Sequence, residues 1–134
     1  MWISRVIWRR ALRWNKEYRK DIQIIGVEPL QSAVINGRPK GAHKIQGIGA
    51  GFIPSILDLS LIDEVLMIDG DEAMAESRML AKTQGILCGI SAGAALLAAE
   101  QVGSRPENEG KRIVVILPDT GERYLSTELF RESN

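Results

Sequence analysis

Apolar and polar positions form blocks along the chain, and these blocks predict strands separated by helices. Four short apolar runs are bounded by charged or turn-forming residues and have the length of buried strands. They span residues 22–27, 63–68, 86–90 and 112–117. Helical patterns lie between the later runs, and continuously apolar strands are typical of parallel sheets covered by helices. The pattern therefore predicts an α/β fold, a parallel sheet with flanking helices.

Two of the predicted helices have recognisable ends. Asp69, with Glu72 three residues later, fits a capping box, and Gly85 fits a helix stop. An alanine-rich run over residues 92–102 ends at Gly103. We therefore expect one helix between Asp69 and Gly85 and a second over residues 92–102.

Residues 1–21 differ in composition from the rest of the chain. Residues 1–20 hold seven Lys/Arg and one Glu, whereas the remainder holds ten Lys/Arg and sixteen Asp/Glu. Apolar positions recur at helical spacing from Ile3 to Tyr18, and the opposite face is basic. We expect an atypical basic amphipathic helix over residues 1–21, followed by a separate unit over 22–134. A surface helix packed on a core is the simplest interpretation, and a membrane-surface, nucleic-acid-binding or targeting helix is the alternative.

The cysteine count and the lengths of the apolar runs favour a cytoplasmic protein. The single cysteine, Cys88, forms no internal disulfide, which suits a reducing compartment. No apolar run approaches the roughly 18–20 residues that span a bilayer. One histidine and one cysteine do not make a tetrahedral zinc site. For the chain as a whole we expect no metal, no nucleic-acid partner and no membrane association.

Ser91 is the most distinctive candidate for contact with a ligand. It follows a predicted strand at the start of the helix over residues 92–102, where its hydroxyl can cap backbone N–H groups and the helix dipole favours electron-rich ligands. The run Gly89-Ile90-Ser91-Ala92-Gly93 matches the G-x-S-x-G elbow of α/β-hydrolases. No histidine follows Ser91, since the only one is His43. The hydrolase interpretation thus lacks its base, and a simple helix cap remains the structural alternative.

Two further segments carry polar or unusual residues. Asp119 and Thr120 follow the predicted strand over residues 112–117, and ligands of open α/β sheets gather at such carboxyl ends. The glycines at positions 47, 49 and 51 are a weak match to a phosphate-binding loop, and they equally allow a glycine-lined substrate wall.

Several stretches together resemble the cysteine synthases, the pyridoxal-phosphate-dependent O-acetylserine sulfhydrylases of fold type II. The most specific is His43-Lys44-Ile45-Gln46-Gly47-Ile48-Gly49-Ala50-Gly51-Phe52, and the others are residues 24–29, 89–94, 105–108 and 121–127. They occur in order over about residues 22–130. The resemblance implies pyridoxal phosphate as cofactor and the conversion of O-acetylserine and sulfide into cysteine and acetate.

The resemblance also implies roles for individual residues. Ser91 corresponds to the hydroxyl that donates a hydrogen bond to the pyridine nitrogen, and Asp119 and Thr120 correspond to neighbours of the cofactor ring. Gln46 and Gly47 correspond to the loop beside the amino-acid substrate.

A possible partner follows from the same resemblance. The basic loop that contains Lys40, His43 and Lys44 lies where the family docks serine acetyltransferase. Here the loop reads Lys40-Gly41-Ala42-His43, which departs from the family's Lys-Pro-Gly-Pro-His.

The family's cofactor-bearing lysine, substrate loop and glycine–threonine phosphate loop lie upstream of the strand at 22–27, where this chain has 21 residues and no glycine. We therefore assign no catalytic residue and expect a truncated cysteine synthase, the carboxyl-terminal part of the large domain, that is inactive as a lone chain. The alternative is a non-catalytic module that pairs with full-length cysteine synthase, with serine acetyltransferase, or with itself as a homo-oligomer.

Overall fold

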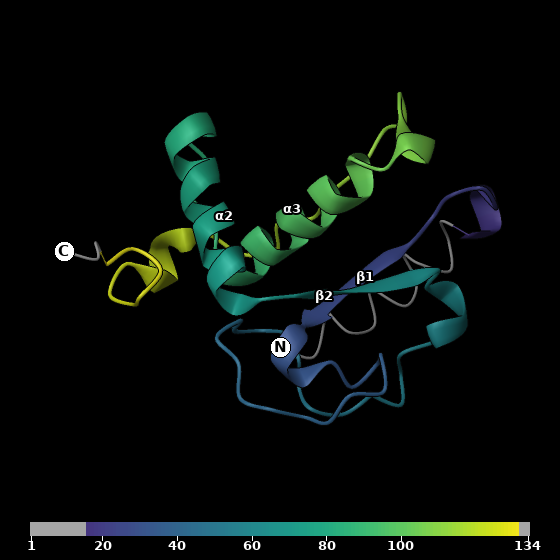
Figure 1. Ribbon diagram of the computed structural model, residues 1–134, viewed down its shortest axis with the longest axis horizontal. Coiled ribbons are helices and arrows are strands. Elements are labelled where there is room, and N and C mark those ends of the chain that lie inside the picture. Colours follow the sequence, from purple (N-terminus) through teal and green to yellow (C-terminus); the bar gives the residue numbers. More distant parts are fainter. Residues whose placement is uncertain (1–15, 132–134) are drawn as a thin grey trace.

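The computed structural model describes residues 16–131 (Figure 1). Two parallel strands, β1 (Ile25–Pro29) and β2 (Glu64–Ile68), form the sheet. Two helices follow, α2 (Gly70–Gln84) and α3 (Ile90–Gly103). Four short 3₁₀ helices complete the described elements: η1 (Leu30–Ser32), η2 (Leu59–Leu61), η3 (Pro106–Asn108) and η4 (Gly121–Tyr124). The mixed α/β class with a parallel sheet and flanking helices is as the sequence predicts.

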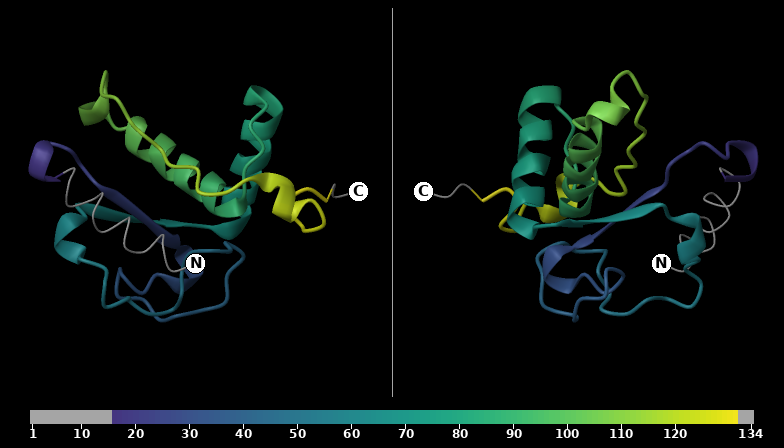
Figure 2. Two further views of the ribbon diagram at one scale, coloured as in Figure 1. Left: turned by 180° about the vertical axis from the view of Figure 1, so that it is seen from behind. Right: turned by 45° about the vertical axis from the view of Figure 1, so that its right-hand side comes forward.

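The helices and the loops lie on opposite sides of the sheet. Helices α2 and α3 pack together on one side, and the long connection between β1 and β2 covers the other (Figures 1 and 2). The core lies between the helices, β2 and the C-terminal segment, and its buried members are Ile45, Ile68, Ala73, Met74, Ile90, Ala94, Ala98, Tyr124 and Leu129. Arg105, two residues after the end of α3, binds the first residue of β2. Its guanidinium donates two hydrogen bonds to the Glu64 carboxylate, at 2.7 and 2.8 Å.

The ends of α2 confirm the sequence prediction. The Asp69 side chain accepts hydrogen bonds from the backbone N–H groups of Asp71 and Glu72, which otherwise have no partner in the first turn. Gly85 closes the helix with φ at 71°, a left-handed conformation that glycine adopts without steric cost. None of the helices within residues 16–131 is long and apolar enough to cross a bilayer.

Two of the four predicted strands are wrong. In residues 86–90 only Cys88 makes a bridge, an isolated antiparallel one to Thr120. The run at 112–117 forms no strand, and the side chains of Val114 and Ile116 are 83% and 52% exposed. An apolar run becomes a strand only where a neighbouring strand bonds its backbone. The described residues supply such a neighbour for β1 and β2 alone.

Most of the predicted N-terminal helix lies outside the described residues. Residues 16–18 are helical, and Lys16 joins this segment to the start of β2. Its Nζ donates to both carboxylate oxygens of Asp63, at 2.8 and 2.6 Å, and to the carbonyl of Ile22 at 3.0 Å. The hydrogen bond from Lys16 holds the pKa of Asp63 below its usual range.

We predict that Gly93→Ala destabilises the protein, because Gly93 is where α3 lies directly against α2. A Cβ at this position would overlap the carbonyl oxygen of Ala73 and lie 2.9 Å from the backbone nitrogen of Ser77. Backbone atoms cannot move aside as a side-chain end can, so urea denaturation should show a loss of about 2 kcal/mol in unfolding free energy.

Gly103→Ala in the same helix is the matched control. The added Cβ would meet only the flexible end of the Ile113 side chain, at 3.2 Å. Its unfolding free energy should stay within about 1 kcal/mol of the parent. Equal effects of the two substitutions would contradict close packing at Gly93.

Candidate functional site

The start of α3 presents Ser91, but not as a helix cap. The helix begins at Ile90, so Gly89 is the N-cap residue and Ser91 lies within the first turn. The expectation that Ser91 caps the helix is therefore wrong. Glycine is required before the helix because a Cβ on Gly89 would overlap the carboxylate of Asp119. Ser91 is 7% exposed, and its hydroxyl makes no hydrogen bond to any of residues 16–131.

Asp119 and Thr120 lie beside this turn. The backbone N–H of Gly89 donates to the Asp119 carbonyl at 3.4 Å, and that of Gly121 donates to the Leu87 carbonyl at 3.1 Å. These bonds form the antiparallel bridge between Cys88 and Thr120. The structure thus brings the segment of Asp119 and Thr120 to the turn that precedes Ser91, while their role in cofactor binding stays a prediction.

Only one of the two oxygens of the Asp119 carboxylate has a hydrogen-bond partner in the described residues. Tyr124 donates its hydroxyl proton to Oδ2 at 2.6 Å, and Oδ1 is buried without a partner among the described residues. Burial, and then the hydrogen bond to Asp119, raise the pKa of Tyr124 to about 12. Sequence reasoning missed Tyr124, although its position five residues after Asp119 on a turn-rich segment allows the contact.

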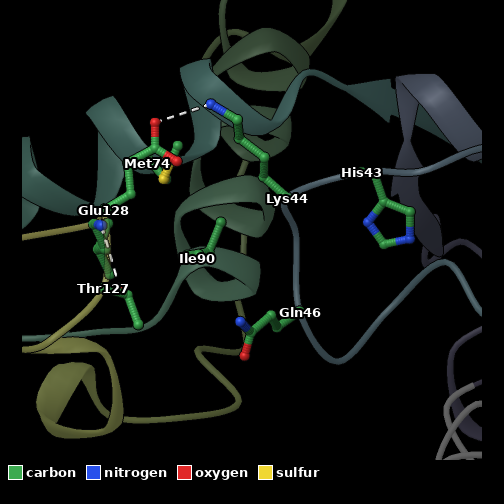
Figure 3. A pocket seen from close by; sticks show the side chains of 8 residues that line it. His43, Lys44, Gln46, Met74, Ile90, Thr127 and Glu128 are labelled. Carbon is green, nitrogen blue, oxygen red and sulfur yellow. Dashed lines mark hydrogen bonds and ion pairs between the residues drawn. The ribbon is translucent and has the colours of Figure 1, made fainter.

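A pocket of about 250 Å³ opens beside the start of α3 (Figure 3). Ile90, the first residue of α3, and Gln46, from the glycine-rich loop, both line it. The remaining lining residues are His43, Lys44, Met74, Thr127, Glu128 and Leu129. The predicted substrate residue Gln46 therefore shares a pocket with the helix that bears Ser91, whereas Gly47 is exposed and does not line it.

Lys44 is the lysine of this pocket, and its amine is held as an ammonium ion. Nζ donates to Asp71 Oδ1 at 2.8 Å and to Glu128 Oε1 at 3.0 Å. Figure 3 shows the bond to Glu128 as a dashed line between two residues that line the pocket. Hydrogen bonds to Asp71 and Glu128 raise the pKa of Lys44. The neutral amine is the form that attacks an aldehyde, and the two carboxylates disfavour that form of Lys44.

His43 supports the glycine-rich loop. Its Nε2 donates to the carbonyl of Gly49 at 2.9 Å, and Nδ1 is buried without a partner in the described residues. Gly49 has φ at 64°, and a Cβ there would meet His43 Nε2 and Pro29. The histidine is thus a loop residue, as the sequence predicts.

Residues 16–131 contain no cluster of three or more His, Cys, Asp or Glu side chains that could hold a metal ion. Cys88 is buried, with Sγ 3.4 Å from the Ser77 hydroxyl.

Comparison with known proteins assigns the chain to a family. The family model described as "Pyridoxal-phosphate dependent enzyme" matches residues 10–119. The chain belongs to this family. Similar curated proteins are the cysteine synthases of Buchnera aphidicola, 52% identical over 124 residues and 88% of this chain, and of Haemophilus influenzae, 52% identical over 120 residues and 85% of this chain. The chain spans 38% of the length of each of these relatives.

A solved structure resembles the fold closely. The crystal structure of cysteine synthase from Entamoeba histolytica superimposes with a TM-score of 0.89 at 50% identity. The match covers 92% of this chain and 36% of that one. Relatives at about half identity thus share the fold of the described elements, and most of their length lies outside the match.

The hydrogen-bond donor at the start of α3 suits the ring nitrogen of pyridoxal phosphate, the cofactor of the family. The Ser91 hydroxyl is a donor with no partner in residues 16–131, which suits a ring nitrogen that accepts one hydrogen bond. The positive end of α3 adds to the attraction for an electron-rich group. A lysine free to attack an aldehyde is not among the residues that line the pocket.

We predict an alkaline loss of stability that depends on Tyr124. The folded state raises the pKa of this phenol from about 10 in unfolded chains to about 12. The resulting stabilisation is fully present below pH 10 and is lost as the pH rises to 12. Unfolding free energies measured from pH 9 to 12 should therefore fall by about 1–3 kcal/mol.

Tyr124→Phe is the control. It should lower stability by about 1–2 kcal/mol at neutral pH, because Asp119 Oδ2 loses its donor. It should also remove most of the additional alkaline loss. An unchanged alkaline profile in this variant would show that another group is responsible.

Proposed function

We propose that this chain supplies the pyridine-nitrogen side of a pyridoxal phosphate site in a cysteine synthase, which converts O-acetylserine and sulfide into cysteine and acetate. One observation carries the proposal: Ser91, a residue only 7% exposed in the first turn of α3, has a hydroxyl that makes no hydrogen bond within the described residues. A hydroxyl without a protein partner can donate a hydrogen bond to a ligand.

The residues around Ser91 perform distinct tasks in this proposal. The Ser91 hydroxyl donates to the ring nitrogen as a neutral partner, so it fixes the ring without adding a charge. Bound pyridoxal phosphate supplies an electron sink for elimination and addition at the substrate's β-carbon. Asp119 and Thr120 border the ring, and Gln46 and Gly47 offer an amide side chain and a backbone N–H to the amino-acid substrate.

We further propose that residues 1–134 alone do not catalyse this reaction. Lys44 is the lysine that lines the pocket, and its amine is bonded to the carboxylates of Asp71 and Glu128. The chain spans 38% of the relatives' length, so a complete site needs groups from the remainder of such a protein. A lysine and phosphate-binding backbone groups are the parts it must provide.

A chimera tests the role of Ser91. The matched segment of this chain replaces its counterpart in the Haemophilus influenzae cysteine synthase, and cofactor affinity and kcat/KM are measured. Ser91→Ala in this chimera should raise the cofactor dissociation constant about tenfold, because one hydrogen bond to a buried acceptor is lost. Ser104→Ala, at the exposed far end of α3, should change neither quantity. Equal behaviour of the two variants would refute the assignment of Ser91.

A second experiment tests the lone chain. Residues 1–134 are mixed with equimolar pyridoxal phosphate and treated with borohydride, and peptide mass mapping records any lysine joined to the cofactor. We expect only weak labelling spread over the exposed lysines, and the same result for Lys44→Arg. Selective labelling of one lysine that disappears on its substitution would overturn the proposal that the lone chain lacks a cofactor lysine.

A non-catalytic role as a partner-binding module is a second candidate. Its support is the exposed apolar segment around Val114, a feature that marks interaction surfaces. Full-length cysteine synthase, serine acetyltransferase and a second copy of the chain are the partners to test by co-purification. We place either function in the cytoplasm, since the one cysteine is a free thiol.

A further inference from the structure

Gln46 presents a side-chain amide with no partner to the pocket beside the start of α3. It lines this pocket of about 250 Å³, and its amide makes no hydrogen bond to any of residues 16–131. Such an amide can both donate to and accept from a ligand. No side-chain bond fixes its orientation, so the backbone that carries Gln46 decides where the amide lies.

The backbone that follows Gln46 is weakly held. Gly47 has φ at 93°, a conformation that favours glycine, and a Cβ on it would meet no other part of the described structure within 4 Å. The next packed residue is Ile48, which is only partly buried against the core. The firmer contacts that locate Gln46 therefore come from the residues before it.

The two residues before Gln46 point in different directions. Ile45 is fully buried in the core, whereas Lys44 and Gln46 line the pocket. This alternation is typical of extended backbone, in which successive side chains point to opposite sides. Lys44 therefore lies on the same side of the segment as Gln46, and its contacts hold that side.

Lys44 connects the loop of Gln46 to two other segments. Its Nζ donates to Asp71 Oδ1, in the first turn of α2, at 2.8 Å and to Glu128 Oε1 at 3.0 Å (Figure 3). Glu128 belongs to the C-terminal segment, residues 121–131, which lines the pocket through Thr127, Glu128 and Leu129. Lys44 thus joins the loop that carries Gln46 to another part of the pocket lining.

Gly70 makes room for Lys44 beside α2. A Cβ on Gly70, the first residue of this helix, would lie 3.1 Å from the Cβ of Lys44 and 3.5 Å from its backbone nitrogen. The loop can therefore approach the helix closely, and the Lys44 ammonium group reaches Asp71, the next residue of α2. A larger residue at position 70 would push the loop away from this contact.

We propose that Lys44 is a positioning residue for Gln46. Its two ion pairs hold the loop against α2 and the C-terminal segment, so that the Gln46 amide meets the amino-acid substrate in a fixed place. The inference rests on the proposed function, in which Gln46 contacts that substrate. Lys44 itself touches no reacting atom in this role.

Both ion pairs are accessible to dissolved salt. The side chain of Lys44 is 46% exposed, and those of Asp71 and Glu128 are each 68% exposed. Exposed ion pairs are weak, and salt screens them, because the Debye length falls from about 10 Å at 0.1 M to about 3 Å at 1 M. Positioning through these pairs therefore makes substrate binding sensitive to salt, which a role in packing alone does not.

The kinetic test uses the cofactor-loaded chimera with the Haemophilus influenzae cysteine synthase, extended to include residue 131 of this chain. Lys44→Met and Glu128→Gln should each raise KM for O-acetylserine about threefold, as expected for an exposed ion pair, with kcat within about twofold of the parent. Added sodium chloride should raise KM in the parent chimera and have little effect in Lys44→Met. Lys44→Arg keeps a cation beside both carboxylates and should retain the parent KM.

Glu122→Gln is the matched control. Glu122 lies on the same C-terminal segment, is exposed and does not line the pocket. Its substitution removes the same charge as Glu128→Gln and should change neither KM nor the salt dependence of KM. Equal effects of the two substitutions would show a general effect of net charge and contradict the inference.

A second measurement uses residues 1–134 without cofactor. Backbone ¹⁵N relaxation by NMR should show larger motions at Gln46 and Gly47 in Lys44→Met than in the parent, and no such increase in Glu122→Gln. Circular dichroism of each variant first establishes that it folds as the parent does. Because this measurement involves no cofactor, it does not depend on the assignment of Ser91.

Three results would each overturn the positioning role: KM that stays unchanged in both Lys44→Met and Glu128→Gln, KM that responds to salt equally in Lys44→Met and the parent, or unchanged motion at Gln46 and Gly47. Failure of the cofactor-site proposal has a different signature, an unchanged cofactor affinity in Ser91→Ala. The two failures are therefore distinguishable.

Discussion

An extended backbone must find a hydrogen-bond partner for each N–H and C=O group, and this requirement governs which parts of the sheet form. Strands β1 and β2 satisfy one another from Ile25 to Pro29 and from Glu64 to Ile68. Residues 112–117 have the composition of a buried strand and no neighbour among the described residues. The same rule that builds the two-stranded sheet leaves the second edge of β1 free.

Local signals explain what the sequence predicts correctly. The ends of α2 depend on Asp69 and Gly85, whose effects reach only two or three residues along the chain. The strand over residues 112–117 depends instead on a partner that is distant or belongs to another part of a protein. Its hydrophobic pattern indicates only that these residues suit a buried strand, so the pattern could not show that no described residue pairs with their backbone.

The candidate site also combines features that local sequence signals indicate with contacts between residues that they do not indicate. Ser91 is visible in the sequence because an apolar run, a glycine and a helical pattern meet at one point, although the helix begins at Ile90, two residues earlier than the cap interpretation requires. The bond of Tyr124 to Asp119 is local, whereas the bond of Lys44 to Glu128 spans 84 positions. No periodicity in a single sequence indicates the second pairing.

Helix α3 carries the candidate ligand group at one end and core residues further along. Ser91 lies in its first turn, and Ala94 and Ala98 of the same helix are buried members of the core. Gly93 brings this part of α3 against the backbone of α2, because a Cβ there would overlap the carbonyl oxygen of Ala73. The close packing of α3 on α2 therefore holds the turn that presents the Ser91 hydroxyl, so the core and the candidate site depend on the same contact.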